Sequence, residues 1–231
     1  MAEAVPVDAQ RGEGPLVRAS GRSKRAASSS GVKQGEYFGG LPMVGTFFYK
    51  GRELGGKLTY CTGSVVHSRT RDLVLTAGHC AVSLKVANNR IFVPQYRHGD
   101  GADKQPSGVF PVHDDGDVFI DPRYKKNTKL PVSDLDVAFV RVGANSKGKA
   151  AEDATGALTF TPTAGYSHQV TVVGYPSSQE HNKDHKAFRC ETSTRRLPGF
   201  RQMRMECGGF YGGVSGGPWI TDYDAGSRKG R

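Results

Sequence analysis

Three short motifs, far apart along the chain, each supply one side chain of the kind that acyl transfer requires. The first is TAGHC, which contains His79 and directly follows an apolar run. The second is DLDVAFV, in which Asp136 precedes an apolar run, and the third is GGVSGGP around Ser215. A serine hydroxyl is a poor nucleophile at neutral pH unless a base lies within hydrogen-bond reach. A histidine supplies that base near pH 7, and a buried carboxylate orients its ring and stabilises the imidazolium. The motifs therefore predict nucleophilic catalysis by Ser215.

The glycines around Ser215 have a predicted function of their own. Glycine adopts backbone conformations that other residues avoid, and it lets the main chain approach a substrate closely. The amides of Gly213 and Ser215 can then point at one spot, where a tetrahedral oxyanion would bind. One such donor stabilises the transition state by about 3 kcal/mol.

In this order, TAGHC, DVAFV and GVSGGP resemble the motifs of trypsin-like serine peptidases with the double β-barrel fold, over about residues 39–221. The resemblance implies a serine endopeptidase, a hydrolase of peptide bonds, in which Ser215 is the nucleophile and His79 is its base. Asp136 would be the residue that orients the base. The segments VVGYP and GGVSGGPW look most like bacterial secreted members, in the branch that includes the glutamyl endopeptidases.

A second aspartate competes for the role of the acid. Asp134 lies two residues before Asp136, and on a strand the two would face the same side. Asp136 immediately precedes the run VAFV, as the acid of the resembling family precedes its own apolar run. We therefore predict that Asp136 is the acid.

The chain departs from the resembling family at three points. Val214 stands where many animal members carry an aspartate that pairs with a freed N-terminal amine, so that route of activation is excluded. Gly209, six positions before Ser215, is not an acid that would attract Lys or Arg substrates. The sequence given stops at Arg231, and five strands are predicted in the second half where the family has six. The second barrel is therefore expected to be incomplete, with an unpaired edge.

The four cysteines fall into two local pairs, Cys61 with Cys80 and Cys190 with Cys207. Four cysteines allow three connectivities, and the sequence alone does not choose among them. The resemblance implies a disulfide between Cys61 and Cys80, beside the histidine. Disulfides suit an oxidising compartment, so we expect a secreted protein. Residues 1–30 contain no apolar signal region, and the signal is expected to lie outside this chain.

Short apolar runs separated by turn residues, with 31 glycines in the chain, predict an all-β protein. No segment has a helical apolar stripe over three turns. The fold class is therefore two packed, antiparallel β-barrels of the six-stranded type. The first set of expected strands is Val44–Tyr49, Leu58–Val66, Asp72–Thr76, Arg90–Val93, Val118–Ile120 and Leu135–Val142. The second set is Leu158–Phe160, His168–Gly174, Ala187–Thr192, Gln202–Cys207 and Gly217–Thr221.

The polar stretch at residues 143–155 is the natural divide between two halves. We predict an N-terminal barrel at residues 36–145, with His79 and Asp136, and a C-terminal barrel at residues 146–231, with Ser215. Residues 1–35 lack a hydrophobic period and are expected to be a disordered basic tail or a pro-segment. The run RSKR at residues 22–25 is either a processing site or part of a solvated tail.

The net charge of +10 raises the question of anionic partners. No zinc finger, helix-turn-helix or aromatic-interleaved basic motif supports nucleic-acid binding, and no apolar stretch approaches the length of a membrane span. The expected partners are protein or peptide substrates, with neither nucleic acid nor membrane. We predict a monomer that needs no cofactor.

Two further groups could hold a metal, although neither is predicted to. His181 and His185 have the spacing of two ligands on a helix, but their neighbourhood indicates a surface loop. Four aspartates are close enough for calcium, without EF-hand spacing: Asp114, Asp115, Asp117 and Asp121.

Two other functions remain open from the sequence. One is a secreted, peptidase-like binding protein that is catalytically weak or silent, which the incomplete barrel and the basic charge favour. The other is a peptidase that acts on its own chain or on one partner. The intact His79, Asp136 and Ser215 argue against the first of these two.

Overall fold

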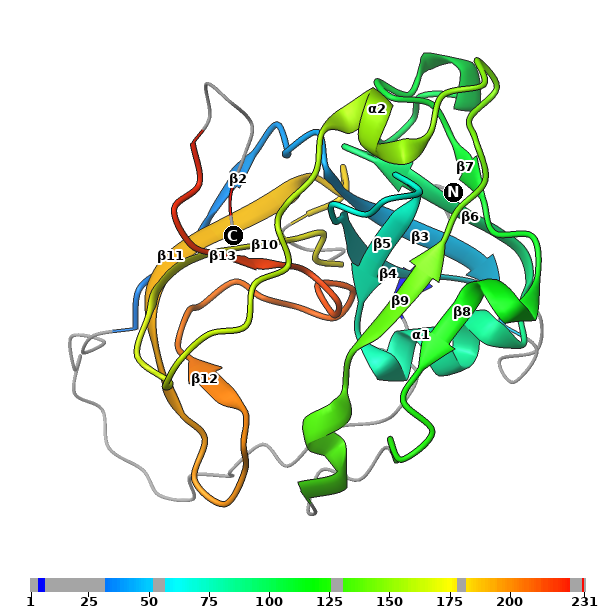
Figure 1. The fold of residues 1–231 in the computed structure, drawn as a ribbon. Coiled ribbons are helices and arrows are strands. Elements are labelled where there is room, and N and C mark those ends of the chain that lie inside the picture. Colours follow the sequence, from blue (N-terminus) through cyan, green and yellow to red (C-terminus); the bar gives the residue numbers. More distant parts are fainter. Residues whose placement is uncertain are drawn as a thin grey trace.

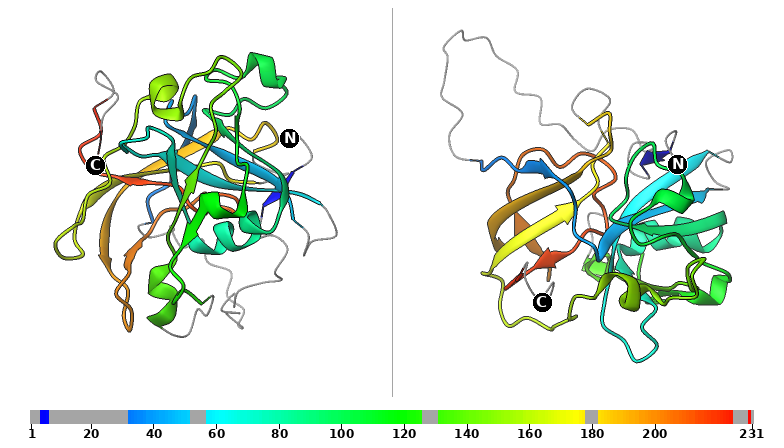
Figure 2. Two further views of the ribbon diagram at one scale, coloured as in Figure 1. Left: turned by 45° about the vertical axis from the view of Figure 1, so that its right-hand side comes forward. Right: turned by 90° about the horizontal axis from the view of Figure 1, so that it is seen from above.

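Two curved β-sheets lie side by side and carry the two halves of the chain (Figure 1). The structure is a computed structural model that describes residues 4–6, 32–51, 57–125, 131–177, 182–224 and residue 230. Seen from above, the two sheets form two separate bodies (Figure 2).

The first sheet has the strand order β7-β6-β3-β4-β5-β9-β8, and these neighbours pair antiparallel. One further strand, β1, pairs parallel with β4. The bounds are β1 Val5–Pro6, β3 Val44–Lys50, β4 Leu58–Val65, β5 Leu73–Thr76, β6 Asn88–Pro94, β7 Phe110–Pro111, β8 Val118–Ile120 and β9 Ala138–Arg141. All six strands predicted for this half are present, with ends shifted by a few residues.

The second sheet has the order β12-β11-β10-β13, and β2 pairs with the beginning of β11, at residues 187–189. Its bounds are β2 Glu36–Phe38, β10 Gln169–Gly174, β11 Ala187–Arg196, β12 Met203–Met205 and β13 Trp219–Ile220. The N-terminal barrel was predicted to begin at residue 36. For residues 36–38 this was wrong, because this strand lies in the second sheet and not in the first. The strand expected at Leu158–Phe160 is reduced to a single bridge between Leu158 and Val66.

Aromatic side chains make up much of the hydrophobic core of the first sheet. Every residue of β3 except Lys50 is buried, as expected for a strand covered on both faces. Its Phe47 ring packs on Phe92 of the neighbouring strand at 4.9 Å between centroids. Its Phe48 packs on Tyr60 and Tyr96. This core makes the first sheet a rigid support for the loops at its edge.

The helices are short, which agrees with the absence of a long helical stripe in the sequence. Among the described residues, the α-helices are α1 Gly78–Lys85 and α2 Ala151–Thr155. The short 3-10 helices of the same residues are η3 Ala102–Lys104, η4 Asp115–Asp117 and η5 Pro131–Leu135. The strand predicted from Leu135 begins instead at Ala138, because the preceding residues turn and the Asp136 amide bonds to the Ser133 carbonyl at 3.1 Å.

Parts of the expected N-terminal tail are ordered. Residues Val5–Pro6 pair with Thr59 and Tyr60 of β4, and Ala4 is buried. Gln34 forms a bridge with Gly208, shortly before the Ser215 motif. The expectation of disorder was therefore wrong for these residues, whereas residues 1–3 and 7–31, which include the RSKR run, lie outside the described residues.

Candidate active site

The register of two strands brings His79 and Asp136 together. Strands β5 and β9 pair so that Thr76 lies opposite Ala138. His79 follows the end of β5 in the first turn of α1, and Asp136 lies two residues before the start of β9. Both side chains therefore start from the same edge of the sheet. The Nδ1 atom of His79 lies 2.8 Å from Oδ2 of Asp136, and the His79 amide donates to Oδ1 at 2.7 Å.

The Asp136 carboxyl is set up to stay ionised. Burial alone raises its pKa, but hydrogen bonds from the side chain and main chain of His79 and from Tyr124 outweigh burial and lower the pKa below its ordinary value. A carboxyl with a lowered pKa contributes stability that is lost only as the pH falls through that lowered pKa. Asp136 is therefore charged at neutral pH and accepts two hydrogen bonds from His79.

The loop with Ser215 is fastened to β4 through Thr62. The Thr62 amide donates to the Ser215 carbonyl at 2.9 Å, and its hydroxyl donates to the Gly213 carbonyl at 2.8 Å. The Tyr175 amide, just after β10, donates to the same hydroxyl at 3.0 Å. One threonine of the first sheet thus holds two carbonyls of a loop that belongs to the second half.

Two glycines of this loop occupy conformations that only glycine adopts without strain. Gly213 has φ +98° and Gly216 has φ +85°. A Cβ atom at Gly213 would overlap the Tyr60 ring, and one at Gly216 would overlap the Thr76 hydroxyl. The glycines allow the loop to lie directly against the first sheet, beside the start of α1.

Both local cysteine pairs form disulfides in the structure, Cys61–Cys80 and Cys190–Cys207. The first bond joins β4 to the residue after His79. The Sγ atom of Cys80 lies 3.8 Å from the Ser215 carbonyl oxygen. The disulfide therefore fixes the helix that carries His79 next to the main chain of Ser215.

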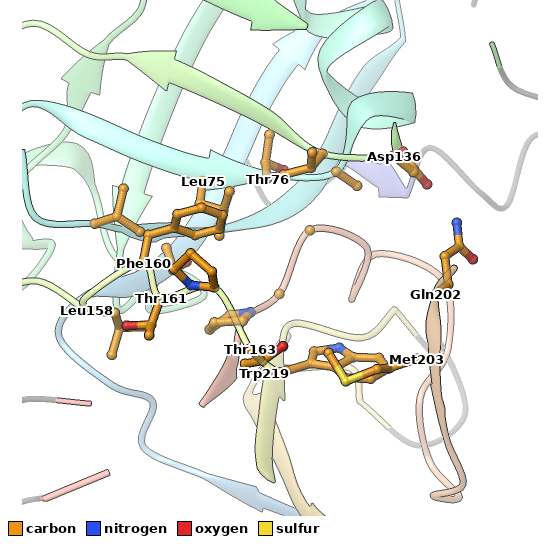
Figure 3. Close-up of a pocket in the computed structure, with 18 of the residues that line it drawn as sticks. Leu75, Thr76, Asp136, Leu158, Phe160, Thr161, Thr163, Gln202, Met203 and Trp219 are labelled. Atoms are coloured by element: carbon orange, nitrogen blue, oxygen red, sulfur yellow. The ribbon is translucent and has the colours of Figure 1, made fainter. Parts of the chain in front are cut away.

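A cleft of about 660 Å³ has His79 and Asp136 in its wall. Gly216, the residue after Ser215, lines the same cleft. Figure 3 shows Phe160 and Leu158 on one side and Trp219 beside Met203 on another, with Asp136 and Gln202 facing each other at one end. Phe160 and Trp219 are exposed although they are large and apolar. The cleft thus combines apolar walls with a few polar groups, as ligand sites commonly do.

The residues considered for metals lie elsewhere and have other contacts. His181 lies outside the described residues, and the His185 ring stacks on His98 at 5.1 Å between centroids. Three of the four aspartates form ion pairs with arginines: Asp115 with Arg90 at 2.7 Å, Asp117 with Arg141 at 3.5 Å and Asp121 with Arg123 at 2.6 Å. Asp114 instead caps η4 together with Asp117. Within the part of the chain that is described, no group of His, Cys, Asp and Glu could hold a metal ion.

The stacked histidines predict a pH dependence of stability. Burial, and then the neighbouring His98, lower the pKa of His185 below its ordinary value. The rings of Tyr60 and Tyr96 also border this pair. A histidine whose pKa is lowered in the folded state binds its proton more weakly there than in the unfolded chain. Stability is therefore lost as the pH falls below the ordinary histidine pKa of about 6.5.

We expect His185→Asn to flatten the decline of the unfolding free energy between pH 7.5 and 5, measured by urea titration. Asparagine tolerates the positive φ of 45° at this position. His113→Asn, at an exposed histidine, serves as the matched control. Equal slopes for wild type and His185→Asn would contradict the prediction.

Sequence reasoning missed several residues that shape the site. Thr62 holds the loop of Ser215, and Tyr124 hydrogen-bonds Asp136. Neither residue belongs to a recognisable motif. Thr62 had one weak signal, its position next to Cys61.

Comparison with solved structures identifies the fold. The crystal structure of protease Anisep from Arthrobacter nicotinovorans aligns with a TM-score of 0.66 at 23% identity, covering 83% of this chain and 82% of that chain. The thermostable serine protease AL20 from an extremophilic microorganism aligns at 0.64 and 21%, covering 79% and 80%. A Glu endopeptidase in complex with MPD aligns at 0.55 and 14%, covering 86% and 83%. The predicted double-barrel fold of serine peptidases is thereby confirmed.

The model of the trypsin-like peptidase domain matches residues 61–226, and the chain therefore belongs to that family. It is by class a serine endopeptidase, which acts on protein substrates. No curated protein sequence matches the chain.

The disulfides and the fold are typical of extracellular proteins. No helix of the described residues is long and apolar enough to cross a membrane.

Proposed function

We propose that the protein is a secreted serine endopeptidase that cleaves peptide bonds through an acyl-enzyme on Ser215. The observation that carries the proposal is the His79–Asp136 pair, with two hydrogen bonds, beside the fastened loop of Ser215. Asp136 accepts from Nδ1 of His79, which leaves Nε2 of the ring to take a proton. His79 Nε2 is buried in the described structure, so a proton accepted there is screened from bulk water.

In the first half of the proposed reaction, His79 removes the hydroxyl proton of Ser215 while the oxygen attacks the carbonyl carbon of the substrate. Asp136 stabilises the imidazolium that forms. The amides of Gly213 and Ser215 donate to the oxyanion, which is supported by the left-handed conformation at Gly213. His79 then gives its proton to the leaving amine, and the peptide bond breaks.

In the second half, a water molecule replaces the leaving amine. His79 takes one proton of this water, and the resulting hydroxide attacks the ester carbon of the acyl-enzyme. The Ser215 oxygen leaves and recovers its proton from His79. No cofactor takes part in these steps. We further propose that the enzyme works as a monomer, with one barrel at residues 36–145, apart from β2, and the other at residues 146–231.

Wild-type protein should release peptides from unfolded casein, and Gly213→Ala should lower kcat by a factor of about 100 to 1,000. The added methyl would overlap Tyr60 and displace an amide of the oxyanion site. Gly148→Ala is the matched control, because Gly148 also has a positive φ, +71°, but nothing lies near its would-be Cβ. Wild-type protein that binds casein without cleaving it would favour the peptidase-like binding protein instead.

A further inference from the structure

The turn that carries Asp136 has little packing of its own. The 3-10 helix η5 has no buried residue, and both Pro131 and Val132 at its start are exposed. Side chains packed in a core are held by many contacts, but an exposed turn is held mainly by its hydrogen bonds. Asp136 needs a fixed position, because its two oxygens bond to two different nitrogens of His79.

Two hydrogen bonds from the second sheet cross the end of the cleft to this turn. The side-chain amide of Gln202 donates to the Ser133 carbonyl at 2.7 Å, and the Arg201 amide donates to Oδ2 of Asp134 at 2.9 Å. Both donors lie in the turn between β11 and β12. In Figure 3, Gln202 extends from this hairpin toward the end of the cleft where Asp136 lies.

The Ser133 carbonyl connects Gln202 to Asp136. The same oxygen accepts from the Asp136 amide at 3.1 Å, so Gln202 holds the atom that anchors the main chain of Asp136. The bond from Arg201 directs one oxygen of Asp134 toward the hairpin. Together the two contacts fix which of the two aspartates is presented to His79.

The hairpin turn that supplies these donors is itself closed. The Leu197 amide donates to the Gln202 carbonyl at 2.9 Å, and the Phe200 amide donates to the Leu197 carbonyl at 3.1 Å. The Arg196 guanidinium lies over the Tyr166 ring at 5.2 Å. The hairpin that supplies the two donors is therefore held in shape by contacts of its own.

We propose that Gln202 is a positioning residue, which holds Asp136 against His79 from across the cleft. This inference rests on the proposed function for its effect on turnover. Gln202 acts through Ser133 and Asp136, and it transfers no proton. Small displacements of a group that supports catalysis reduce the rate without abolishing it.

The test is Gln202→Glu, which keeps the shape of the side chain and replaces the donor by an acceptor. We expect kcat on a peptide substrate to fall about tenfold, with KM changed less than twofold and the melting temperature unchanged. Gln202→Arg restores a donor and should recover most of kcat. Gln169→Glu, the same substitution at an exposed residue of β10, is the matched control.

An unchanged kcat in Gln202→Glu would overturn the inference, and so would a change confined to KM, which would indicate a substrate contact. A loss that follows a lower melting temperature, and that Gln202→Arg does not restore, would also overturn it. Proton NMR gives a readout without turnover. The Nδ1 proton of His79 should be sharp in wild type and Gln169→Glu, and broadened in Gln202→Glu. If wild type shows no hydrolysis but this broadening is seen, the proposed function fails while the positioning role stands.

Discussion

Replacing His79 by alanine should lower kcat by about a millionfold while the protein stays folded. Without the imidazole, Ser215 loses the base that the proposed mechanism assigns to it, and the hydroxyl remains a weak nucleophile at neutral pH. The loss exceeds what any single hydrogen bond supplies, because base, acid and nucleophile act as one unit. The measurement is kcat on a peptide ester, at enzyme concentrations high enough to detect the residual rate.

The chain contains a well-matched control for this experiment. His67 also places Nδ1 next to a carboxylate, Oε1 of Glu152 at 2.7 Å, but it is exposed and does not line the cleft. His67→Ala should keep wild-type kcat. Undiminished hydrolysis by His79→Ala would exclude the proposed mechanism.

Asp136→Asn should lower kcat by about ten-thousandfold with little effect on KM. Asparagine fits the space of the carboxylate but offers its amide hydrogens to Nδ1, so the ring is held in the wrong tautomer and its charged form loses a counter-ion. The lowered pKa of Asp136 shows that the fold favours the charged carboxylate here. The substitution removes that charge with minimal change of shape.

Asp134→Asn provides the comparison, since the two aspartates are two residues apart and differ in their contacts. Asp134 accepts from the Arg201 amide and has no hydrogen bond to His79 among those described. We expect a loss of less than about tenfold for Asp134→Asn, since its contact acts on the turn and not on the imidazole. Losses of equal size in the two variants would show that Asp136 has no special role.

The choice between these aspartates shows what the sequence can predict. The spacing DLDVAFV left both carboxylates on one side of a strand, and only the resemblance favoured Asp136. In the structure the residues before Ala138 form a turn instead, which sends Asp134 to the hairpin and Asp136 to His79. Asp136 thus lies against His79, although the strand predicted at this residue was wrong.

Contacts between the two halves could not be predicted from local patterns. Residues 36–38 read as the start of the first barrel, yet they pair with β11, about 150 positions later. Thr62 and Gln202 are equally ordinary in the sequence, because their importance comes from partners far along the chain. Apolar periodicity reports burial within one element, and it contains no information about which edge that element joins.

A fluorophosphonate probe tests the central claim most directly, because it forms a covalent bond only with a serine that is activated as a nucleophile. The wild-type protein should take up one equivalent of probe, and peptide mapping by mass spectrometry should place the adduct on Ser215. His79→Ala should remain unlabelled under the same conditions. Absence of labelling in folded wild-type protein, or equal labelling of both proteins, would contradict the account.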